Sequence, residues 1–236
     1  MKPFLTLARE HTEAGAHLSL HEHDGEHYLQ FNGRTLMSTR ATVSERKLAD
    51  LACESLQHQR PPRILIGGLG FGFTLRRVLE LAGPEATVEV VEIFGSIVRW
   101  NREFLRAVNG QLLDDARVTV FVEDVYDYLQ GRNKDPYDAI LLDVDNGPTA
   151  MVRPGNSRLY HRPGLLHLAR ALKPGGTAAF WSAAEERPFA RRLAESGFQV
   201  RPVQVNANER GKGSCLVYVA RHRDYSGGRG GSKRVP

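Results

Sequence analysis

The sequence predicts an α/β fold, in which helices cover a mostly parallel sheet and a small antiparallel β-domain precedes that sheet. Between residues 63 and 223, short apolar runs alternate with segments of helical periodicity, the pattern of repeated strand-helix units. These runs are continuously apolar, as expected of parallel strands buried on both faces. The first forty residues alternate apolar and polar side chains instead, which predicts antiparallel strands.

The N-terminal segment, residues 1–40, is predicted to form a small β-meander. Asp24-Gly25 and Asn32-Gly33 favour two-residue hairpin turns. Alternating side chains around these turns mark strands over 17–21, 27–31 and 35–37. A helix should begin near Thr42, because Thr42 and Glu45 have the spacing of a capping box.

Residues 41–225 are predicted to form the larger domain. Its expected parallel strands cover 64–66, 87–91, 118–122, 139–142 and 177–181. Helices are expected over 71–82, 97–108, a short segment from 125, 163–172 and 188–196. Two late strands are expected over 198–205 and 215–220. The glycines of Gly211-Lys212-Gly213 between them predict a hairpin, which would add a terminal antiparallel strand to the sheet.

Composition excludes several classes of protein. The chain has 236 residues, of which 41% are hydrophobic and 25% charged, as is ordinary for a globular protein. No apolar run approaches the roughly 18 residues of a transmembrane helix, so no membrane partner is expected. The first residues lack the apolar stretch of a signal peptide, and the two cysteines form no disulfide framework. A cytoplasmic location is therefore expected.

The positive charge is concentrated at the end of the chain. Residues 221–236 hold five basic side chains and one aspartate, a net charge of +4 out of the total of +5. A uniformly basic surface for nucleic acid is therefore not expected. Residues 226–236 contain four glycines and no apolar cluster, which predicts a disordered basic tail.

A glycine-rich loop follows the first strand of the larger domain. Gly68, Gly70 and Gly72 would let the backbone approach a ligand closely, just before a helix N-terminus. A dinucleotide fingerprint starting at Gly68 requires glycine at position 73, which is Phe73, so a dinucleotide oxidoreductase is disfavoured. The spacing alone leaves open that the loop is only a tight strand-to-helix turn.

Acidic residues follow the next two strands, at the edge where open parallel sheets bind ligands. Glu92 is a candidate to accept hydrogen bonds from a ribose diol, and Glu123 or Asp124 from an exocyclic adenine amine. The structural alternatives are a solvated loop acid at Glu92 and a helix N-cap at Asp124. Capping and ligand binding can coexist in one side chain.

The fourth strand ends in a pair of acids, Asp143 and Asp145. At a spacing of two on an extended chain, their side chains point the same way. Two carboxylates at the mouth of a sheet are costly unless they serve a cation or share protons. Of all the acidic positions, this pair is the one for which a purely structural role is least favoured.

The glycine loop and the acids, in this order, resemble the class I S-adenosylmethionine-dependent methyltransferase fold, which is Rossmann-like. Within that fold the chain is most similar to the spermidine synthase (polyamine aminopropyltransferase) family, over residues 32–183 and in the motifs at 64–72, 90–93, 122–124 and 137–143. The resemblance implies transfer of an aminopropyl group from decarboxylated S-adenosylmethionine to a small-molecule amine, without a metal. It implies that Glu92 holds the ribose, Asp124 the adenine amine, and Asp143 the attacking amine.

Several positions depart from the family's pattern. The family's loop carries an aspartate where this chain has Gly70. That acid suits a donor without a carboxylate, so its loss would allow intact S-adenosylmethionine to bind. The second acid of the fourth-strand motif is replaced by Asn146, and the residues that hold the diamine are replaced at Leu36, Thr39, Ala41 and Glu45. The resemblance therefore supports putrescine poorly as the substrate.

Three functions remain open. An aminopropyltransferase acting on a polyamine or related amine is favoured by the order of the motifs and the N-terminal β-domain. A methyltransferase that uses intact S-adenosylmethionine on a small molecule is favoured by Gly70 and the lost diamine residues. A nucleoside-binding protein without turnover is disfavoured by Asp143 and Asp145, since simple binding needs no acid pair. A homodimer is compatible with each.

Other residues carry weaker signals. His21, His23 and His27 surround a turn and would suit a metal, but a solvated hairpin rim is the favoured interpretation. Phe180-Trp181 is expected to pack in the sheet, and Cys215 to be a buried small hydrophobe.

Overall fold

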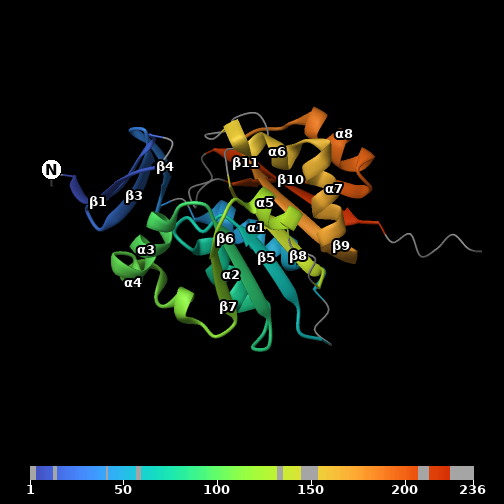
Figure 1. Cartoon of the computed structure of the whole chain (residues 1–236), viewed down its shortest axis with the longest axis horizontal. Coiled ribbons are helices and arrows are strands. Elements are labelled where there is room, and N and C mark those ends of the chain that lie inside the picture. The colour runs from blue at the N-terminus through green and yellow to red at the C-terminus, as the bar shows by residue number, and fades with distance from the viewer. Residues whose placement is uncertain are drawn as a thin grey trace, which may run out of the picture.

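Two β-sheets organise the fold (Figure 1). The computed structural model describes residues 4–12, 15–40, 42–56, 60–131, 135–144, 154–206 and 213–223. In this part of the chain, an antiparallel sheet has the order β1-β2-β3-β4 and a larger sheet has the order β10-β11-β9-β8-β5-β6-β7. Figure 1 shows the smaller sheet at one side of the larger one, close to α3 and α4.

The smaller sheet consists of β1 (Leu5–His11), β2 (His17–His23), β3 (Glu26–Phe31) and β4 (Arg34–Ser38). Its two predicted turns are confirmed: φ is 51° and 78° at Asp24 and Gly25, and 49° and 75° at Asn32 and Gly33. Two successive residues with positive φ are what such tight hairpins require. Strand β1 was not predicted, because its pairing with β2 shifts register between Thr6 and Ala8 and interrupts the alternation.

The larger sheet is parallel at its centre. Parallel pairing joins β5 (Arg63–Gly67), β6 (Thr87–Glu92), β7 (Val118–Val122), β8 (Tyr137–Leu142) and β9 (Leu172–Ser182). An antiparallel hairpin of β10 (Phe198–Asn206) and β11 (Ser214–His222) then attaches through β11 to β9. The predicted mostly parallel sheet with a terminal antiparallel strand is therefore confirmed.

Strand β9 begins earlier than the predicted start at Thr177. Helix α7 (Arg162–Ala171) ends just before Leu172, which already pairs with Tyr137. The pairing then resumes at Ala139 and Thr177, so residues 173–176 bulge out of the ladder. Gly176 is required there, since an added Cβ would lie 2.9 Å from the carbonyl oxygen of Lys173. Such a bulge resembles a loop in the sequence, which explains the wrong boundary.

Helices cover both faces of the larger sheet. On β5, Ile64 and Ile66 pack in the core formed with α1, α2 and α3, while Leu65 packs in the core formed with α5, α7 and α8. The central strands β5, β6 and β8 are therefore buried on both sides, as their apolar runs predicted, whereas the edge strand β7 is only partly buried. The remaining helices are α1 (Val43–Cys53), α2 (Phe73–Leu81), α3 (Gly95–Glu103), α4 (Arg106–Asn109), α5 (Val125–Gly131), α6 (Ser157–Tyr160) and α8 (Arg187–Glu195).

Some predicted features lie outside the described residues. These are the acid Asp145 with its neighbour Asn146, the turn residues Gly211 and Lys212, and the tail at 226–236. Among the helices of the described chain, none has the length and apolar character needed to cross a membrane.

Candidate active site

A cavity of about 270 Å³ lies at the carboxyl ends of β5, β6, β7 and β8. These four strands are neighbours in the sheet, so the residues that follow them converge although they are far apart in the sequence. The predicted residues that line the cavity are Gly68, Gly70, Glu92, Glu123, Asp124 and Asp143. Gly72 is not part of the lining, and instead occupies the N-cap position of α2.

The glycine loop needs its glycines for backbone reasons as well as for ligand access. Gly68, Gly70 and Gly72 have φ angles of 92°, 52° and 81°, a region that other residues adopt only with strain. An added Cβ on Gly68 would lie 2.3 Å from the carbonyl oxygen of Asp143. The loop therefore packs directly against the end of β8, which carries the candidate catalytic acid.

Glu92 ties the glycine loop to the end of β6. Its Oε2 accepts a hydrogen bond from the backbone N–H of Leu69 at 2.9 Å, and its Oε1 accepts one from Phe94 at 2.9 Å. The side chain is buried, which raises the pKa of its carboxyl group, while these backbone donors favour the ionised form. Glu92 is therefore no solvated loop acid.

Asp124 caps a helix and faces the cavity at the same time. Its Oδ1 accepts a hydrogen bond from the backbone N–H of Tyr126 at 2.9 Å, which caps the N-terminus of α5. Its Oδ2 accepts from the guanidinium of Arg158 at 3.1 Å. Asp124 and the adjacent Glu123 both line the cavity, so the cap also faces the candidate ligand site.

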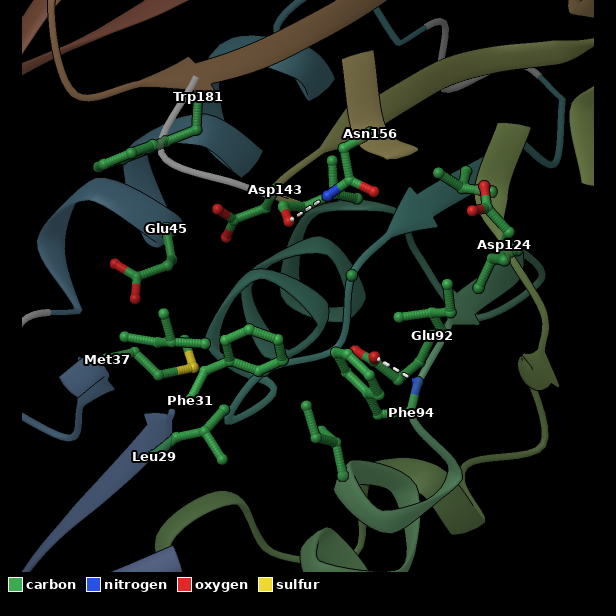
Figure 2. Close-up of a pocket in the computed structure, with 18 of the residues that line it drawn as sticks. Leu29, Phe31, Met37, Glu45, Glu92, Phe94, Asp124, Asp143, Asn156 and Trp181 are labelled. Atoms are coloured by element: carbon green, nitrogen blue, oxygen red, sulfur yellow. Dashed lines mark hydrogen bonds between the residues drawn. The ribbon is translucent and has the colours of Figure 1, made fainter. Parts of the chain in front are cut away.

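Two carboxylates point into the end of the cavity opposite Asp124 (Figure 2). Asp143 accepts a hydrogen bond from the Thr74 hydroxyl at 3.3 Å, and burial raises the pKa of Asp143 to about 6. Glu45 accepts from the Ser44 hydroxyl at 2.7 Å. Burial and the nearby charge of Asp143 raise the pKa of Glu45 to about 7. The side-chain donors to these two acids are hydroxyl groups, which do not neutralise their negative charge.

The capping box predicted for α1 is wrong. Thr42 is at the N-cap position, but its side chain makes no capping hydrogen bond. Glu45 lies on the face of α1 that packs toward the sheet, and it is only 7% exposed. The spacing of a hydroxyl and an acid was present, but the tertiary position of the helix directs the acid into the cavity.

The N-terminal sheet forms an apolar wall of the same cavity (Figure 2). Leu29 and Phe31 come from β3 and Met37 from β4, while Trp181 extends from the end of β9. Met37 also lies against the glycine loop, because an added Cβ on Gly70 would be 2.7 Å from its Cε atom. The smaller sheet is therefore part of the site.

Comparison with known proteins agrees with this geometry. A model of the spermine/spermidine synthase domain matches residues 43–210, which include α1, the glycine loop and the strand-end acids. This chain belongs to the spermine/spermidine synthase family.

The similar curated proteins include members with two different activities. The polyamine aminopropyltransferase of Mycobacterium tuberculosis is 34% identical over 157 residues, which are 61% of this chain and 28% of that protein. Putrescine N-methyltransferase 2 of Nicotiana attenuata is 32% identical over 118 residues, 49% of this chain and 31% of that protein. This chain thus spans less than a third of the length of these two relatives.

The fold of the spermine/spermidine synthase family is also seen among solved structures. The spermidine synthase from Thermotoga maritima superposes with a TM-score of 0.73 at 18% identity, covering 92% of this chain and 72% of that one. Because the superposition covers 92% of this chain, it includes at least part of the N-terminal region as well as the larger sheet. It confirms the predicted fold class.

Glu45, Met37 and Asn156 are among the cavity residues that were not predicted as site residues. Asn156 donates a hydrogen bond to the carbonyl oxygen of Val144 at 3.3 Å. Trp181 packs in the sheet and against the core, as expected, and it also lines the cavity. Trp181 lies at the carboxyl end of β9, and the position at a strand end, which identified the acids, would also have identified it as a site residue.

The three histidines of the N-terminal hairpin do not converge. In the β2–β3 register, His27 lies opposite Glu22 and Tyr28 opposite His21, so His27 projects from the other face of the sheet than His21 and His23. In the described part of the chain, no group of three or more His, Cys, Asp or Glu side chains is arranged to hold a metal ion.

Proposed function

We propose that this chain transfers an aminopropyl group from decarboxylated S-adenosylmethionine to an amine. Membership of the spermine/spermidine synthase family supports the reaction class, as does the activity of the Mycobacterium tuberculosis relative. The observation that carries the proposal is the location of Asp143. It follows β8 beside the glycine loop, in the same cavity as Glu92 and Asp124.

The end of the cavity that contains Glu92, Glu123 and Asp124 would bind the nucleoside. Backbone N–H groups, among them those of Leu69 and Phe94, hold the Glu92 carboxylate at the cavity wall, where it would accept hydrogen bonds from the ribose hydroxyls. Asp124 would accept a hydrogen bond from the adenine amine beside its capping bond. Gly68 and Gly70, without side chains, would allow the donor to lie against the loop.

The acid at the other end would handle the proton of the acceptor. An alkylamine has a pKa of about 10.4 and is mostly protonated at neutral pH. Asp143 would bind the ammonium group and then accept a proton from it, directly or through water.

The neutral nitrogen would attack the aminopropyl carbon that is bonded to the sulfonium. The new C–N bond forms as the C–S bond breaks, and the bonding electron pair moves to sulfur, which neutralises the sulfonium. The products are the alkylated amine and methylthioadenosine, and the proton passes from the carboxyl group to solvent. The protein would mainly align nucleophile, carbon and sulfur.

A methyltransferase is the second candidate, and Gly70 favours it. Because no acid occupies position 70, the carboxylate of intact S-adenosylmethionine would meet no negative charge there. The similarity to a putrescine N-methyltransferase supports this alternative. The same acids would deprotonate the amine, and the second product would be S-adenosylhomocysteine.

We also infer that residues 1–40 form a separate β-domain that closes the cavity of the domain at 41–225. The apolar side chains of Leu29, Phe31 and Met37 support this division, because they cover the cavity without belonging to the larger sheet.

The test is product analysis with each donor. The full chain is incubated with either donor and a series of amines, and the thioether product is identified by chromatography. We expect methylthioadenosine from the decarboxylated donor, while S-adenosylhomocysteine would establish methyl transfer. Asp143→Asn should lower the rate by on the order of a hundredfold to ten-thousandfold. Asp114→Asn, at an exposed aspartate paired with Arg106, is the matched control.

Binding of methylthioadenosine without product from either donor would contradict both transfer reactions. The function would then be nucleoside binding alone.

A further inference from the structure

We propose that Glu45 is a second carboxylate ligand of the acceptor, and that the acceptor carries one ammonium group on an apolar body. This inference rests on the proposed transfer function and names the substrate class of the same site. Glu45 would determine the specificity for the acceptor, while Asp143 would accept the proton.

The first argument is the charge of the cavity. Its described lining contains five carboxylates and, among those residues, no lysine, arginine or histidine: Glu45, Glu92, Glu123, Asp124 and Asp143. Asp124 has Arg158 as a cationic partner and Glu92 has backbone donors. Glu45 and Asp143 accept hydrogen bonds from the hydroxyl groups of Ser44 and Thr74, and Glu45 also accepts one from its own backbone, but these donors carry no charge. A hydroxyl neutralises no charge, so this end of the cavity suits a cationic ligand.

The second argument is the proximity of the two acids. Their carboxylates point into the same end of the cavity, between Trp181 and Met37 (Figure 2). The negative charge of Asp143 is close enough to contribute, after burial, to the raised pKa of Glu45. An ammonium group has three N–H donors and one positive charge, and would satisfy both carboxylates at once.

The third argument is the apolar surface around the pair. Leu29, Phe31, Met37 and Trp181 line the cavity beside the two acids (Figure 2). A second ammonium group on the acceptor would be desolvated against these side chains without a partner among the described residues. An alkyl or aryl body would instead bury apolar surface there. The geometry therefore favours a monoamine over a diamine.

Calorimetric titration of the full chain, saturated with methylthioadenosine, tests this inference. The two probes are pentylamine and putrescine, which have the same length and differ by a methyl group in place of the second amine. We expect pentylamine to bind at least tenfold more tightly. Putrescine binding as tightly as pentylamine, or more tightly, would overturn the acceptor class.

Proton release provides a second readout that a merely structural role of Glu45 would not change. Binding of an ammonium group should ionise both acids and release protons at roughly pH 6.5, and the release should vanish well above pH 8. It is measured by repeating the titration in buffers of different ionisation enthalpy. The titratable groups near Glu45 are Asp143 and Cys215, and the pKa of Cys215 is raised to about 11, so its thiol stays protonated throughout.

The decisive variant is Glu45→Gln, which keeps the shape of the side chain and an acceptor for Ser44. It should weaken pentylamine binding at least tenfold and reduce the proton release, while the affinity for methylthioadenosine stays unchanged. Glu45→Asp should restore part of both. Glu54→Gln, at an exposed acid following the same helix, is the control.

Unchanged pentylamine affinity in Glu45→Gln would overturn the role of Glu45. That result is distinct from failure of the proposed function, in which the parent protein would form no product from either donor with any of the amines.

Discussion

The side chain of Met37 occupies the space into which a side chain at position 70 would extend. Gly70 has a φ of 52°, and an added Cβ would lie 2.7 Å from Cε and 2.9 Å from Sδ of Met37. Met37 belongs to β4 of the smaller sheet, and Gly70 to the loop after β5. The N-terminal sheet therefore contacts the glycine loop directly. A substitution at Gly70 needs a smaller side chain at position 37.

Gly70→Asp should favour the decarboxylated donor once Met37 is shortened. In a Met37→Ala background the new carboxylate has room, and it would repel the carboxylate of intact S-adenosylmethionine. Like charges about 4 Å apart cost roughly 1 to 4 kcal/mol between bulk water and a protein surface. The measurement is the ratio of the two dissociation constants in Met37→Ala with and without Gly70→Asp. An unchanged ratio would mean that position 70 does not face the end at which the donors differ.

Glu92→Gln should weaken the binding of methylthioadenosine by roughly 1.5–3 kcal/mol, the range for a hydrogen bond to a charged group. In the parent, both carboxylate oxygens of Glu92 accept hydrogen bonds, from the backbone N–H groups of Leu69 and Phe94. In the variant, the NH₂ group of glutamine would face one of these N–H groups, and that hydrogen bond would be lost. Calorimetry gives the affinity, with Glu80→Gln at a half-exposed acid as control. A variant that binds as tightly as the parent would disprove the ribose role.

The contribution of Glu45 and Asp143 to the stability of the ligand-free protein should fall as pH rises from about 4 to about 7. The pKa values of Glu45 and Asp143 are raised to about 7 and about 6, so the folded state holds protons that the unfolded chain has already released. For Glu45 the loss is on the order of 2 kcal/mol over this range. Glu45→Gln should therefore melt higher than the parent at pH 8 but not at pH 5. Thermal denaturation checks this, and parallel curves for parent and variant would refute it.

Asp124→Asn should separate the two roles of Asp124. Asparagine caps helices about as well as aspartate, so the melting temperature should change little, whereas affinity for the nucleoside should fall. Asp124→Ala should in addition lose about 1 kcal/mol of stability with the cap. Melting temperature and affinity for methylthioadenosine are measured on both variants. If Asp124→Asn binds methylthioadenosine normally, Asp124 is only a cap.

Truncation after Tyr225 should leave the melting temperature and nucleoside affinity unchanged. The removed segment is rich in glycine and has no apolar cluster to offset the entropy of ordering. Thermal denaturation of the truncated and full chains is the comparison, and a large drop would show that the tail docks.

Most of the fold and half of the site follow from local sequence patterns. Continuous apolar runs identified the parallel strands because both of their faces are buried, as Leu65 between Ile64 and Ile66 shows. Glu92 and Asp143 were predictable because they lie at the carboxyl ends of such strands, and the carboxyl ends of neighbouring parallel strands meet at one edge. No knowledge of distant contacts was needed for these residues.

Only the tertiary structure decided the other side of the cavity. Glu45 has the spacing of a capping acid, and its turn toward Asp143 depends on how α1 packs on the sheet. Met37 and Phe31 are ordinary strand residues until the smaller sheet lies against the glycine loop. Strand periodicity specifies which face of a strand is apolar, but not which surface covers it. That choice depends on contacts between segments that are remote in the sequence, and local patterns contain no information about them.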